Sequence, residues 1–331
     1  MDSLTQIVLG IAVAEVCAGK ELKNRTFLYG AILGTIPDLD VMVGKFLNPV
    51  DSVMIHRGLS HSLLFHILLS FPLGWLITRF ENSKVGFRKA ALMSFCCLFT
   101  HALLDWFTTW GTQLLWPLPH RFSLKTIFVI DPLYTLPFIY FLIRVWNAKE
   151  TALRYKFAMK GLIVSSSYLL LSCVIKLYAL HQFKEAATAQ KIDYTEIIVK
   201  PSPFNLILWN ANIDTKDAYL MGDYSLFDSK PITFQQYTKK PELEAQLQDN
   251  PDFEKLKKIS EGWYLVTETN GTLSLNDLRF GLIDENPKAP RFAFSYQFVK
   301  GKQGLHAVEA PRERGDAKML LSKMVTRLKG N

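Results

Sequence analysis

The sequence predicts a multi-pass α-helical membrane bundle of about six segments, followed by a C-terminal α+β, β-rich extramembrane domain. Two observations lead to this fold class. Residues 1–181 contain long apolar runs separated by short charged stretches, whereas residues 182–331 mix 21 Lys and Arg evenly with 20 Asp and Glu. We therefore divide the chain into a membrane-embedded domain, 1–181, and an extramembrane domain, 182–331.

Six runs qualify as membrane helices by hydropathy, since about 20 apolar residues span the roughly 30 Å of hydrocarbon. They cover residues 3–19, 26–46, 59–79, 90–110, 127–146 and 161–181. The first run is the weakest, because it is short and carries Glu15. The second is interrupted by Ile36-Pro37-Asp38-Leu39-Asp40, where we expect the helix to kink or stop.

The basic residues between the runs predict an orientation. Three alternate loops hold twelve cations: Lys20, Lys23, Arg25, Arg79, Lys84, Arg88, Lys89, Arg144, Lys149, Arg154, Lys156 and Lys160. The two remaining loops hold four: Lys45, Arg57, Arg121 and Lys125. Because cytoplasmic loops carry the excess of Lys and Arg, we expect both termini and the C-terminal domain on the non-cytoplasmic side of a bacterial inner membrane.

The charge distribution, the N-terminal residues and the positions of the cysteines narrow the class of protein further. The net charge is +8, and +7 of it lies in residues 1–181 between apolar runs, which is typical of a membrane surface and not of nucleic-acid binding. The acidic start Met1-Asp2-Ser3 does not predict a cleaved signal peptide. Four cysteines lie inside apolar segments, so we interpret them as small buried hydrophobic residues: Cys17, Cys96, Cys97 and Cys173.

Short runs rich in β-branched and aromatic residues predict strands after residue 190. They are Glu196–Lys200, Phe204–Asn210, Ala218–Leu226, Trp263–Thr269 and Phe292–Val299. Asn270-Gly271 predicts a hairpin turn, and Asn286-Pro287 another turn. Residues 240–260 have a helical, charged pattern, and we expect a frayed helix in the basic tail 309–331.

Ionisable side chains collect at one end of the predicted helices. Asp38 and Asp40 end the second segment, and a run from His56 to His61 begins the third. His101 and Asp105 lie near the end of the fourth segment, four residues apart and therefore on one helix face. Because successive helices alternate in direction, all of these residues should lie toward the outer leaflet, where they predict a metal site.

The predicted metal ligands are Asp38, Asp40, His61, His101 and Asp105, with His56 and Arg57 as catalytic residues at the open side. Taken singly, each pattern has a structural interpretation: a hydrogen-bonded His–Asp pair, capped helix ends, and Ser60 as an N-cap. Imidazole and carboxylate without thiolate favour zinc, with manganese and iron as alternatives. An open position on such an ion lowers the pKa of water, so hydrolysis is the expected reaction class.

Several motifs, in order, resemble the YdjM-like family of bacterial inner-membrane proteins. They are residues 1–6, Gly34–Asp40, His56–Ser62, Thr100-His101 with Asp105, Gly111–Pro117 and Ile130–Tyr134. The resemblance covers roughly residues 1–150 and implies a membrane-bound, metal-dependent hydrolase. Many members have His where this chain has Gln6, a departure that bears on any ligand role for this position.

Three functions compete at this stage. The first is a metallohydrolase acting on a lipid-associated or envelope substrate at the outer leaflet, with a phosphoester as one candidate bond, since Arg57 and a metal can both meet phosphate. The second is an ion-binding or transport protein, which would want ionisable groups spread across the membrane depth. The third is a membrane scaffold with a vestigial site. The clustering at one end favours the first.

Overall fold

The computed structural model describes residues 1–284, 290–301, 304–311 and 316–331. The chain divides into two compact units. One unit comprises Met1–Val43, Ile55–Val174 and Pro203–Asn205, and it is helical. The other comprises Gly44–Met54, Ile175–Ser202 and Leu206–Asn331, and it contains the strands. The predicted fold class is confirmed: a helical region with five candidate membrane spans precedes a β-rich domain.

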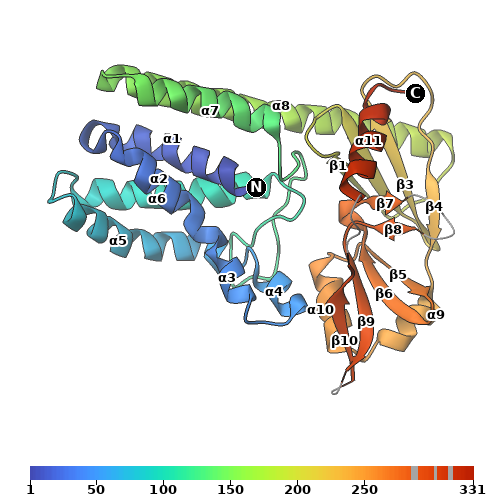
Figure 1. The fold of residues 1–331 in the computed structure, drawn as a ribbon. Coiled ribbons are helices and arrows are strands. Elements are labelled where there is room, and N and C mark those ends of the chain that lie inside the picture. Colours follow the sequence, from blue (N-terminus) through green and yellow to red (C-terminus); the bar gives the residue numbers. More distant parts are fainter. Residues whose placement is uncertain (285–289, 302–303, 312–315) are drawn as a thin grey trace. The chain divides into compact units, whose positions relative to one another are not determined.

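Each of the six predicted segments contains a helix (Figure 1). The long helices are α1 (Ser3–Leu22), α2 (Arg25–Thr35), α5 (Leu63–Phe80), α6 (Phe87–Trp106), α7 (Pro132–Asn147) and α8 (Thr151–Ala189). Helix α7 has 16 residues and is shorter than the five candidate spans. Helix α8 has 39 residues, so it begins inside the predicted fifth loop and continues past the predicted end at residue 181.

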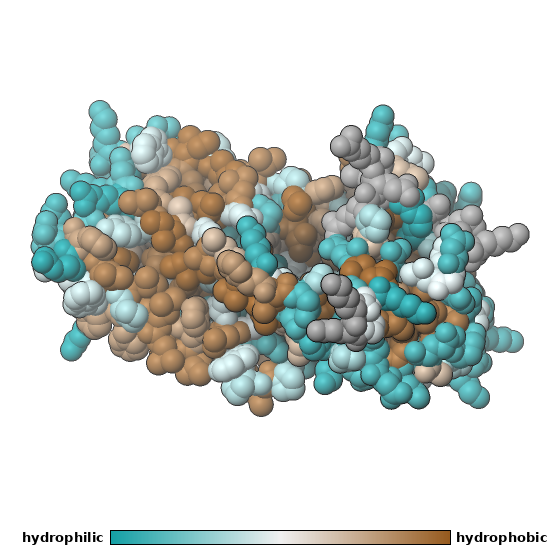
Figure 2. All heavy atoms as spheres, turned by 60° about the horizontal axis from the view of Figure 1, so that its bottom comes forward, coloured by the Kyte–Doolittle hydropathy of each residue, from teal (hydrophilic) through white to brown (hydrophobic). Residues whose placement is uncertain are grey.

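Helix α1 lies at the centre of the helical unit, packed against α2, α6 and α7. Two thirds of its span is buried in protein, the largest share among the five candidate spans of the described chain. By hydropathy, α1 equals the spans Arg25–Gly44 and Phe87–Trp106. In its central position, polar side chains such as Gln6 and Glu15 face other helices and not lipid. By contrast, α5 and α8 expose many large apolar side chains, and Figure 2 shows hydrophobic atoms covering much of the visible face of the helical unit.

Helices α1 and α2 approach closely at glycines. A Cβ atom on Gly30 would lie 2.4 Å from the Cα of Ile11, and one on Gly34 would lie 2.6 Å from the carbonyl oxygen of Gln6. Small residues spaced four apart permit such contact between membrane helices. The close contact brings the end of α2 against the start of α1, where Gln6 lies.

The predicted interruption of the second segment is confirmed. Helix α2 ends at Thr35 and continues as a 3₁₀ turn, η1 (Ile36–Leu39), and then as the one-turn helix α3 (Asp40–Gly44). Pro37 lies at the start of η1, where its missing N–H costs nothing. A second break follows α4 (Pro49–Ile55), where the 3₁₀ turn η2 (Leu59–His61) precedes α5.

The β-rich unit contains two four-stranded antiparallel sheets. The first has the order β1-β2-β3-β4 and is formed by Glu196–Pro201, Leu208–Asp214, Ala218–Ser225 and Gln235–Thr238. The second has the order β10-β9-β6-β5 and is formed by Gly304–Glu309, Ser295–Gly301, Thr272–Asp277 and Tyr264–Thr269. Strands β7 (Leu282–Asp284) and β8 (Arg291–Phe292) pair separately. Helices α9 (Pro241–Glu244), η3 (Ala245–Leu247), α10 (Pro251–Ile259), η4 (Leu278–Phe280) and α11 (Asp316–Leu328) complete it.

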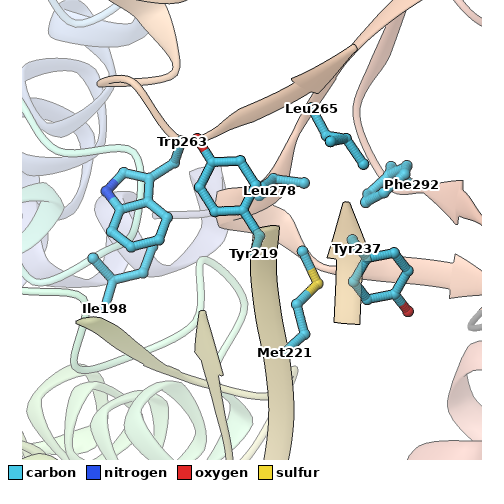
Figure 3. Close-up of a cluster of buried hydrophobic side chains, with 8 residues drawn as sticks. All are labelled: Ile198, Tyr219, Met221, Tyr237, Trp263, Leu265, Leu278 and Phe292. Atoms are coloured by element: carbon cyan, nitrogen blue, oxygen red, sulfur yellow. The ribbon is translucent and has the colours of Figure 1, made fainter. Parts of the chain in front are cut away.

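One hydrophobic cluster joins these sheets (Figure 3). It contains Ile198, Tyr219, Met221, Tyr237, Trp263, Leu265, Leu278 and Phe292. The Asn270-Gly271 hairpin is confirmed, since β5 and β6 pair up to Thr269 and Thr272 and both turn residues have positive φ. Arg327 on α11 binds Asp228, and it holds the pKa of Asp228 below its usual value although burial acts in the opposite direction.

Several details differ from the predictions. Strands β4 and β10 were not predicted, and the predicted strand at Phe204–Asn210 begins only at Leu208, as β2. The predicted strand at Phe292–Val299 is divided between β8 and β9. The N-cap of α5 is Ser62, whose hydroxyl accepts from Phe65 N, and not Ser60. The turn predicted at Asn286-Pro287 lies outside the described residues.

Candidate metal centre

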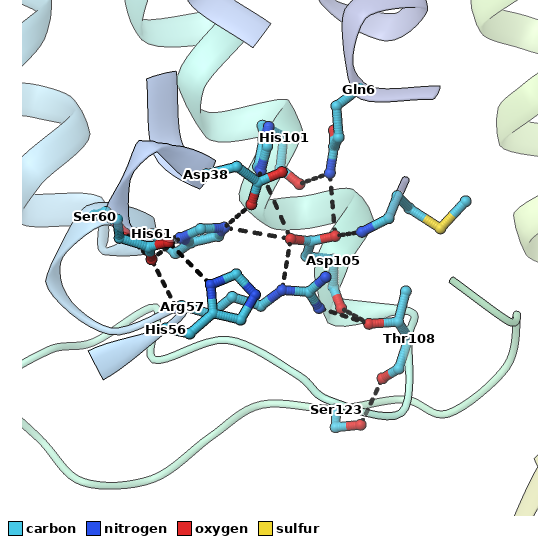
Figure 4. Close-up of polar contacts among 12 residues, drawn as sticks. Gln6, Asp38, His56, Arg57, Ser60, His61, His101, Asp105, Thr108 and Ser123 are labelled. Carbon is cyan, nitrogen blue, oxygen red and sulfur yellow. Dashed lines mark hydrogen bonds and ion pairs between the residues drawn. The ribbon is translucent and has the colours of Figure 1, made fainter. Parts of the chain in front are cut away.

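Four of the five predicted metal ligands come together (Figure 4). Asp38 projects from η1, His61 from η2, and His101 and Asp105 from one face of α6. One donor atom from each side chain lies within 4.8 Å of the other three. His61, His101 and Asp105 are almost completely buried, and the side chain of Asp38 is 20% exposed. The helix breaks thus place the two 3₁₀ turns, η1 and η2, against the end of α6.

The separations between these donor atoms match a tetrahedral ion. His61 Nε2 lies 3.4 Å from Asp38 Oδ1 and 3.3 Å from Asp105 Oδ2. His101 Nε2 lies 3.5 Å and 3.6 Å from the same two oxygens. Ligands bound tetrahedrally at about 2.0–2.2 Å are about 3.3–3.6 Å apart, whereas N–H···O hydrogen bonds are about 2.7–3.2 Å long. The spacing therefore fits ligands of one ion better than it fits ion pairs.

The same four atoms have no hydrogen-bond partner among the described residues. They are Asp38 Oδ1, His61 Nε2, His101 Nε2 and Asp105 Oδ2. Leaving one buried polar atom unpaired costs about 1–3 kcal/mol. Asp105 Oδ2 has the guanidinium of Arg57 at 3.1 Å, and the other three atoms still require compensation. A divalent cation satisfies all four at once, and it also offsets the negative charge that Asp38, Asp40 and Asp105 carry in excess of Arg57 and the α-amino group of Met1.

The opposite nitrogen of each imidazole is fixed by an acceptor. His101 Nδ1 donates to the carbonyl oxygen of Gly34 at 2.6 Å. His61 Nδ1 lies 3.0 Å from Ser60 Oγ, and this hydroxyl gives its own hydrogen to Asp40 Oδ2 at 2.7 Å. Both Nδ1 atoms therefore carry the proton, which leaves the lone pair of each Nε2 directed at the two carboxylates. This tautomer is the one that binds a metal through Nε2.

Asp40, the fifth predicted ligand, has a different place. Its carboxylate accepts from Ser60 Oγ and from Arg57 N at 2.9 Å, and it contacts His56 Nδ1 at 2.9 Å. These contacts occupy both oxygens, and Asp40 lies outside the four-residue group. From the sequence alone, Asp38 and Asp40 are equally good candidate ligands, because both lie beside Pro37 at the end of the second segment. In the structure, only Asp38 lies in the four-residue group.

The two predicted catalytic residues lie beside the centre. Arg57 Nε is 3.1 Å from Asp105 Oδ2, and Arg57 Nη1 donates to Thr108 Oγ1 at 2.9 Å. Arg57 has φ 58°, a strained conformation for a residue other than glycine, held by Asp40 on its N–H and by Gln113 N on its carbonyl oxygen. The side chain of His56 is 27% exposed and is oriented by Asp40.

Three further residues surround the ligands. Gln6 donates through Nε2 to Asp105 Oδ1 at 3.1 Å and to the carbonyl oxygen of His101 at 3.2 Å, so it orients a ligand. The backbone nitrogen of Met1 also donates to Asp105 Oδ1. His66 is buried, and its Nε2 lies 3.0 Å from the carbonyl oxygen of Ser60, so it supports η2.

Sequence inspection did not identify the outer contacts. Ser60 was assigned to a helix cap, and neither the Gly34 carbonyl nor Thr108 had any predicted role. The spacing of Gly30 and Gly34 is the one available signal, because small residues four apart indicate a close helix contact that exposes carbonyl groups to a neighbour. Glu15, another buried acid of the bundle, binds Arg154 and Thr26 and lies near the other end of α1.

We predict that Ser60→Ala weakens zinc binding about 10–100-fold, the usual effect of losing a hydrogen bond behind a ligating histidine. The substitution removes the acceptor of His61 Nδ1–H and leaves all four ligands in place. Competition with a chromogenic zinc chelator measures the change. Ser70→Ala, which removes a hydroxyl bonded to Ile67 O elsewhere on α5, is the matched control. Equal affinities in the two variants would contradict the role of Ser60.

The fold and the centre define a class: multi-pass helical membrane proteins with a buried His and Asp cluster able to hold a metal ion. The family model for "YdjM inner membrane protein" matches residues 1–183, and the chain belongs to that family. The chain is also 32% identical over 117 residues to Inner membrane protein YbcI of Escherichia coli (strain K12). That match covers 33% of this chain and 66% of YbcI, slightly under two thirds. No solved structure matches the chain.

Proposed function

We propose that this protein is a membrane-embedded metal-dependent hydrolase whose ion is held by Asp38, His61, His101 and Asp105. The observation that carries the proposal is the set of four buried donor atoms without hydrogen-bond partners, spaced 3.3–3.6 Å across four imidazole–carboxylate pairs. Two imidazoles and two carboxylates without thiolate favour zinc, and manganese or iron would accept the same donors. A divalent ion supplies Lewis acidity and lowers the pKa of water.

Hydrolysis needs room for water and substrate beyond the four protein ligands. Among these ligands only Asp38 is partly exposed, at 20% of its side chain, so we assign the open side to Asp38. His56 lies on Asp40 beside it and is also partly exposed. The approach to the site is thus between Asp38 and His56.

The surrounding side chains have separate roles. Asp40 holds His56 by Nδ1, and we assign proton transfer with the leaving group to the opposite nitrogen, Nε2. Arg57 holds Asp105 in position and contributes positive charge next to the reacting group. Asp40 and Ser60 keep His61 in the metal-binding tautomer. These residues bind, orient and exchange protons, and they are all supplied by two short turns and the end of α6.

The hydrolase proposal is tested with purified protein stripped of metal and reloaded with zinc. Phosphate release from dioleoyl phosphatidic acid in mixed micelles should require the ion and should fall at least about 100-fold in Asp105→Asn, which keeps the shape of a ligand but removes its charge. Glu21→Gln, on a partly exposed side chain paired with Lys89, is the control. Metal-independent release, or equal release by both variants, would contradict the proposal.

The ion-transport alternative has less support. A conduction path needs ionisable groups along the membrane depth. Glu15, at the other end of α1, is engaged by Arg154 through two hydrogen bonds of 2.8 Å and 2.7 Å and by Thr26. Because its charge is neutralised by Arg154, Glu15 does not provide a further ion-binding position between the centre and the opposite face of the membrane. Metal-dependent hydrolysis without metal uptake into proteoliposomes would separate the two functions.

We further propose that the substrate is lipid-associated or belongs to the envelope, at the outer leaflet, and that the C-terminal domain is non-cytoplasmic. The twelve-to-four distribution of loop cations supports this orientation. We predict that an alkaline phosphatase reporter fused at Lys240 is active and that a green fluorescent reporter exported by the same route is dark. Fluorescence from a fusion at Lys240 would contradict both the proposed orientation of the C-terminal domain and the proposed outer-leaflet position of the site.

A further inference from the structure

The entrance to the centre is bordered by exposed apolar side chains. Helix α3 begins at Asp40, two residues after Asp38, and its three consecutive residues Val41, Met42 and Val43 are each 50–58% exposed. Leu39 lies between the two acids in sequence and is 47% exposed, and Leu59, the first residue of η2, is 45% exposed. Exposed apolar side chains so close to a polar site mark a surface that contacts hydrocarbon or another apolar group.

This border continues the lipid-facing surface of the same span. The candidate span Arg25–Gly44 contains both α2 and α3, and only 28% of it is buried in protein. Leu28 and Ile32 on α2 are at least half exposed, as are Val41 and Met42. In a member of an inner membrane family, hydrocarbon covers this row. The apolar surface therefore extends from the bilayer to the residue next to a metal ligand.

The exposed members of the centre lie at this border. His61, His101 and Asp105 are each at most 1% exposed, whereas the side chains of Asp38 and His56 are 20% and 27% exposed. Asp38 immediately precedes Leu39, and Asp40 connects α3 to His56. The partly exposed side of the centre is therefore the side next to α3.

We propose that the substrate is a membrane amphiphile with a phosphoester head, and that it enters sideways from the lipid with its hydrocarbon chain along Leu39, Val41, Met42 and Val43. This inference rests on the proposed function. The head reaches Asp38 and His56 while the chain stays in contact with apolar side chains, which avoids transferring hydrocarbon into water. In the reaction, water oxygen bonds to phosphorus, the bond from phosphorus to the alcohol oxygen breaks, and the alcohol oxygen takes a proton from His56. The attacking water releases one proton as it becomes part of the phosphate, and this proton restores the one that His56 gave up.

The test compares two chain lengths in the zinc-loaded full-length protein. Dioleoyl phosphatidic acid supplies long chains, and dihexanoyl phosphatidic acid supplies the same head with chains too short to stay in a membrane. We expect the parent to prefer the dioleoyl substrate. In the triple variant Val41→Asn, Met42→Asn, Val43→Asn, the ratio of the two kcat/KM values should fall about tenfold or more, through KM. Leu170→Asn, on the exposed face of α8, should leave this ratio unchanged.

A binding measurement keeps the two proposals separable. Native mass spectrometry of the zinc-loaded protein in detergent should show dioleoyl phosphatidic acid retained by the parent and by Leu170→Asn but lost from the triple variant. If binding follows this pattern but no hydrolysis is detected, lateral entry is supported and the proposed reaction is contradicted. Hydrolysis of both substrates at equal rates, or a triple variant with the parent's ratio and binding, would overturn lateral entry and leave the hydrolase.

Discussion

His61→Ala is expected to abolish the metal binding and the hydrolysis proposed above while the protein remains inserted and folded. Of the two imidazoles, His61 lies nearer to both carboxylates, with its Nε2 at 3.4 Å from Asp38 and 3.3 Å from Asp105. Its removal takes away one of four ligands, and we expect zinc affinity to fall by more than the roughly 100-fold upper effect of a supporting residue. The bundle depends on helix packing and lipid contact, to which one imidazole adds little.

Metal content per chain and thermal melting in the presence of a chelator together measure this effect. With the metal removed from both proteins, parent and variant should melt at similar temperatures, because Ser60 still donates to Asp40 after the substitution. His181→Ala, an exposed histidine paired with Glu185, is the matched control and should retain the metal. Equal metal content in His61→Ala and the parent, with a lower metal-free melting temperature, would make His61 a structural residue.

Glu15→Ala is expected to cause the largest loss of stability while leaving the metal centre loaded. Arg154 binds both oxygens of Glu15, at 2.8 Å and 2.7 Å, and both side chains are almost fully buried. Removing the acid leaves a buried guanidinium without its counter-ion, which costs about 3–5 kcal/mol. By comparison, Glu21→Ala breaks an exposed pair with Lys89 and should cost about 0–1 kcal/mol.

The double variant Glu15→Leu, Arg154→Met separates charge from packing. Replacing both partners by apolar side chains of similar size removes the unpaired charge, so most of the lost stability should return. Unfolding in graded denaturing detergent, monitored by circular dichroism, measures all three variants. A double variant as unstable as Glu15→Ala would show that the cost is in packing, and metal loss in Glu15→Ala would show that the two ends of α1 are coupled.

Much of the fold could be predicted because membrane helices are recognisable in a sequence as long, continuous apolar segments. The interruption at Pro37 and the hairpin at Asn270-Gly271 were predictable for local reasons, a missing donor and two residues that tolerate positive φ. The start of helix α8 could not be predicted, because the Lys and Arg residues of its first turns are typical of a cytoplasmic loop. Strands β4 and β10 are edge strands with mixed polarity, and their pairing is set by neighbours distant in sequence.

The candidate site was predictable in composition but not in arrangement. The i, i+4 spacing of His101 and Asp105 and the alternating helix directions placed the ligands at one end of the bundle. Asp38 and Asp40 have different contacts because the 3₁₀ turn η1 ends between them, and the role of Ser60 depends on where α5 begins. Both are decided by tertiary contacts, which a single sequence does not reveal.

X-ray absorption spectroscopy of the purified, zinc-loaded protein tests the central claim, that Asp38, His61, His101 and Asp105 hold one ion. The structure predicts a first shell of nitrogen and oxygen at about 2.0–2.2 Å, with outer scattering from two imidazoles that drops to one in His101→Ala. A sulfur shell at about 2.3 Å would instead place the ion at the cysteines of α1 and α6, and a spectrum unchanged in His101→Ala would contradict the four-residue centre.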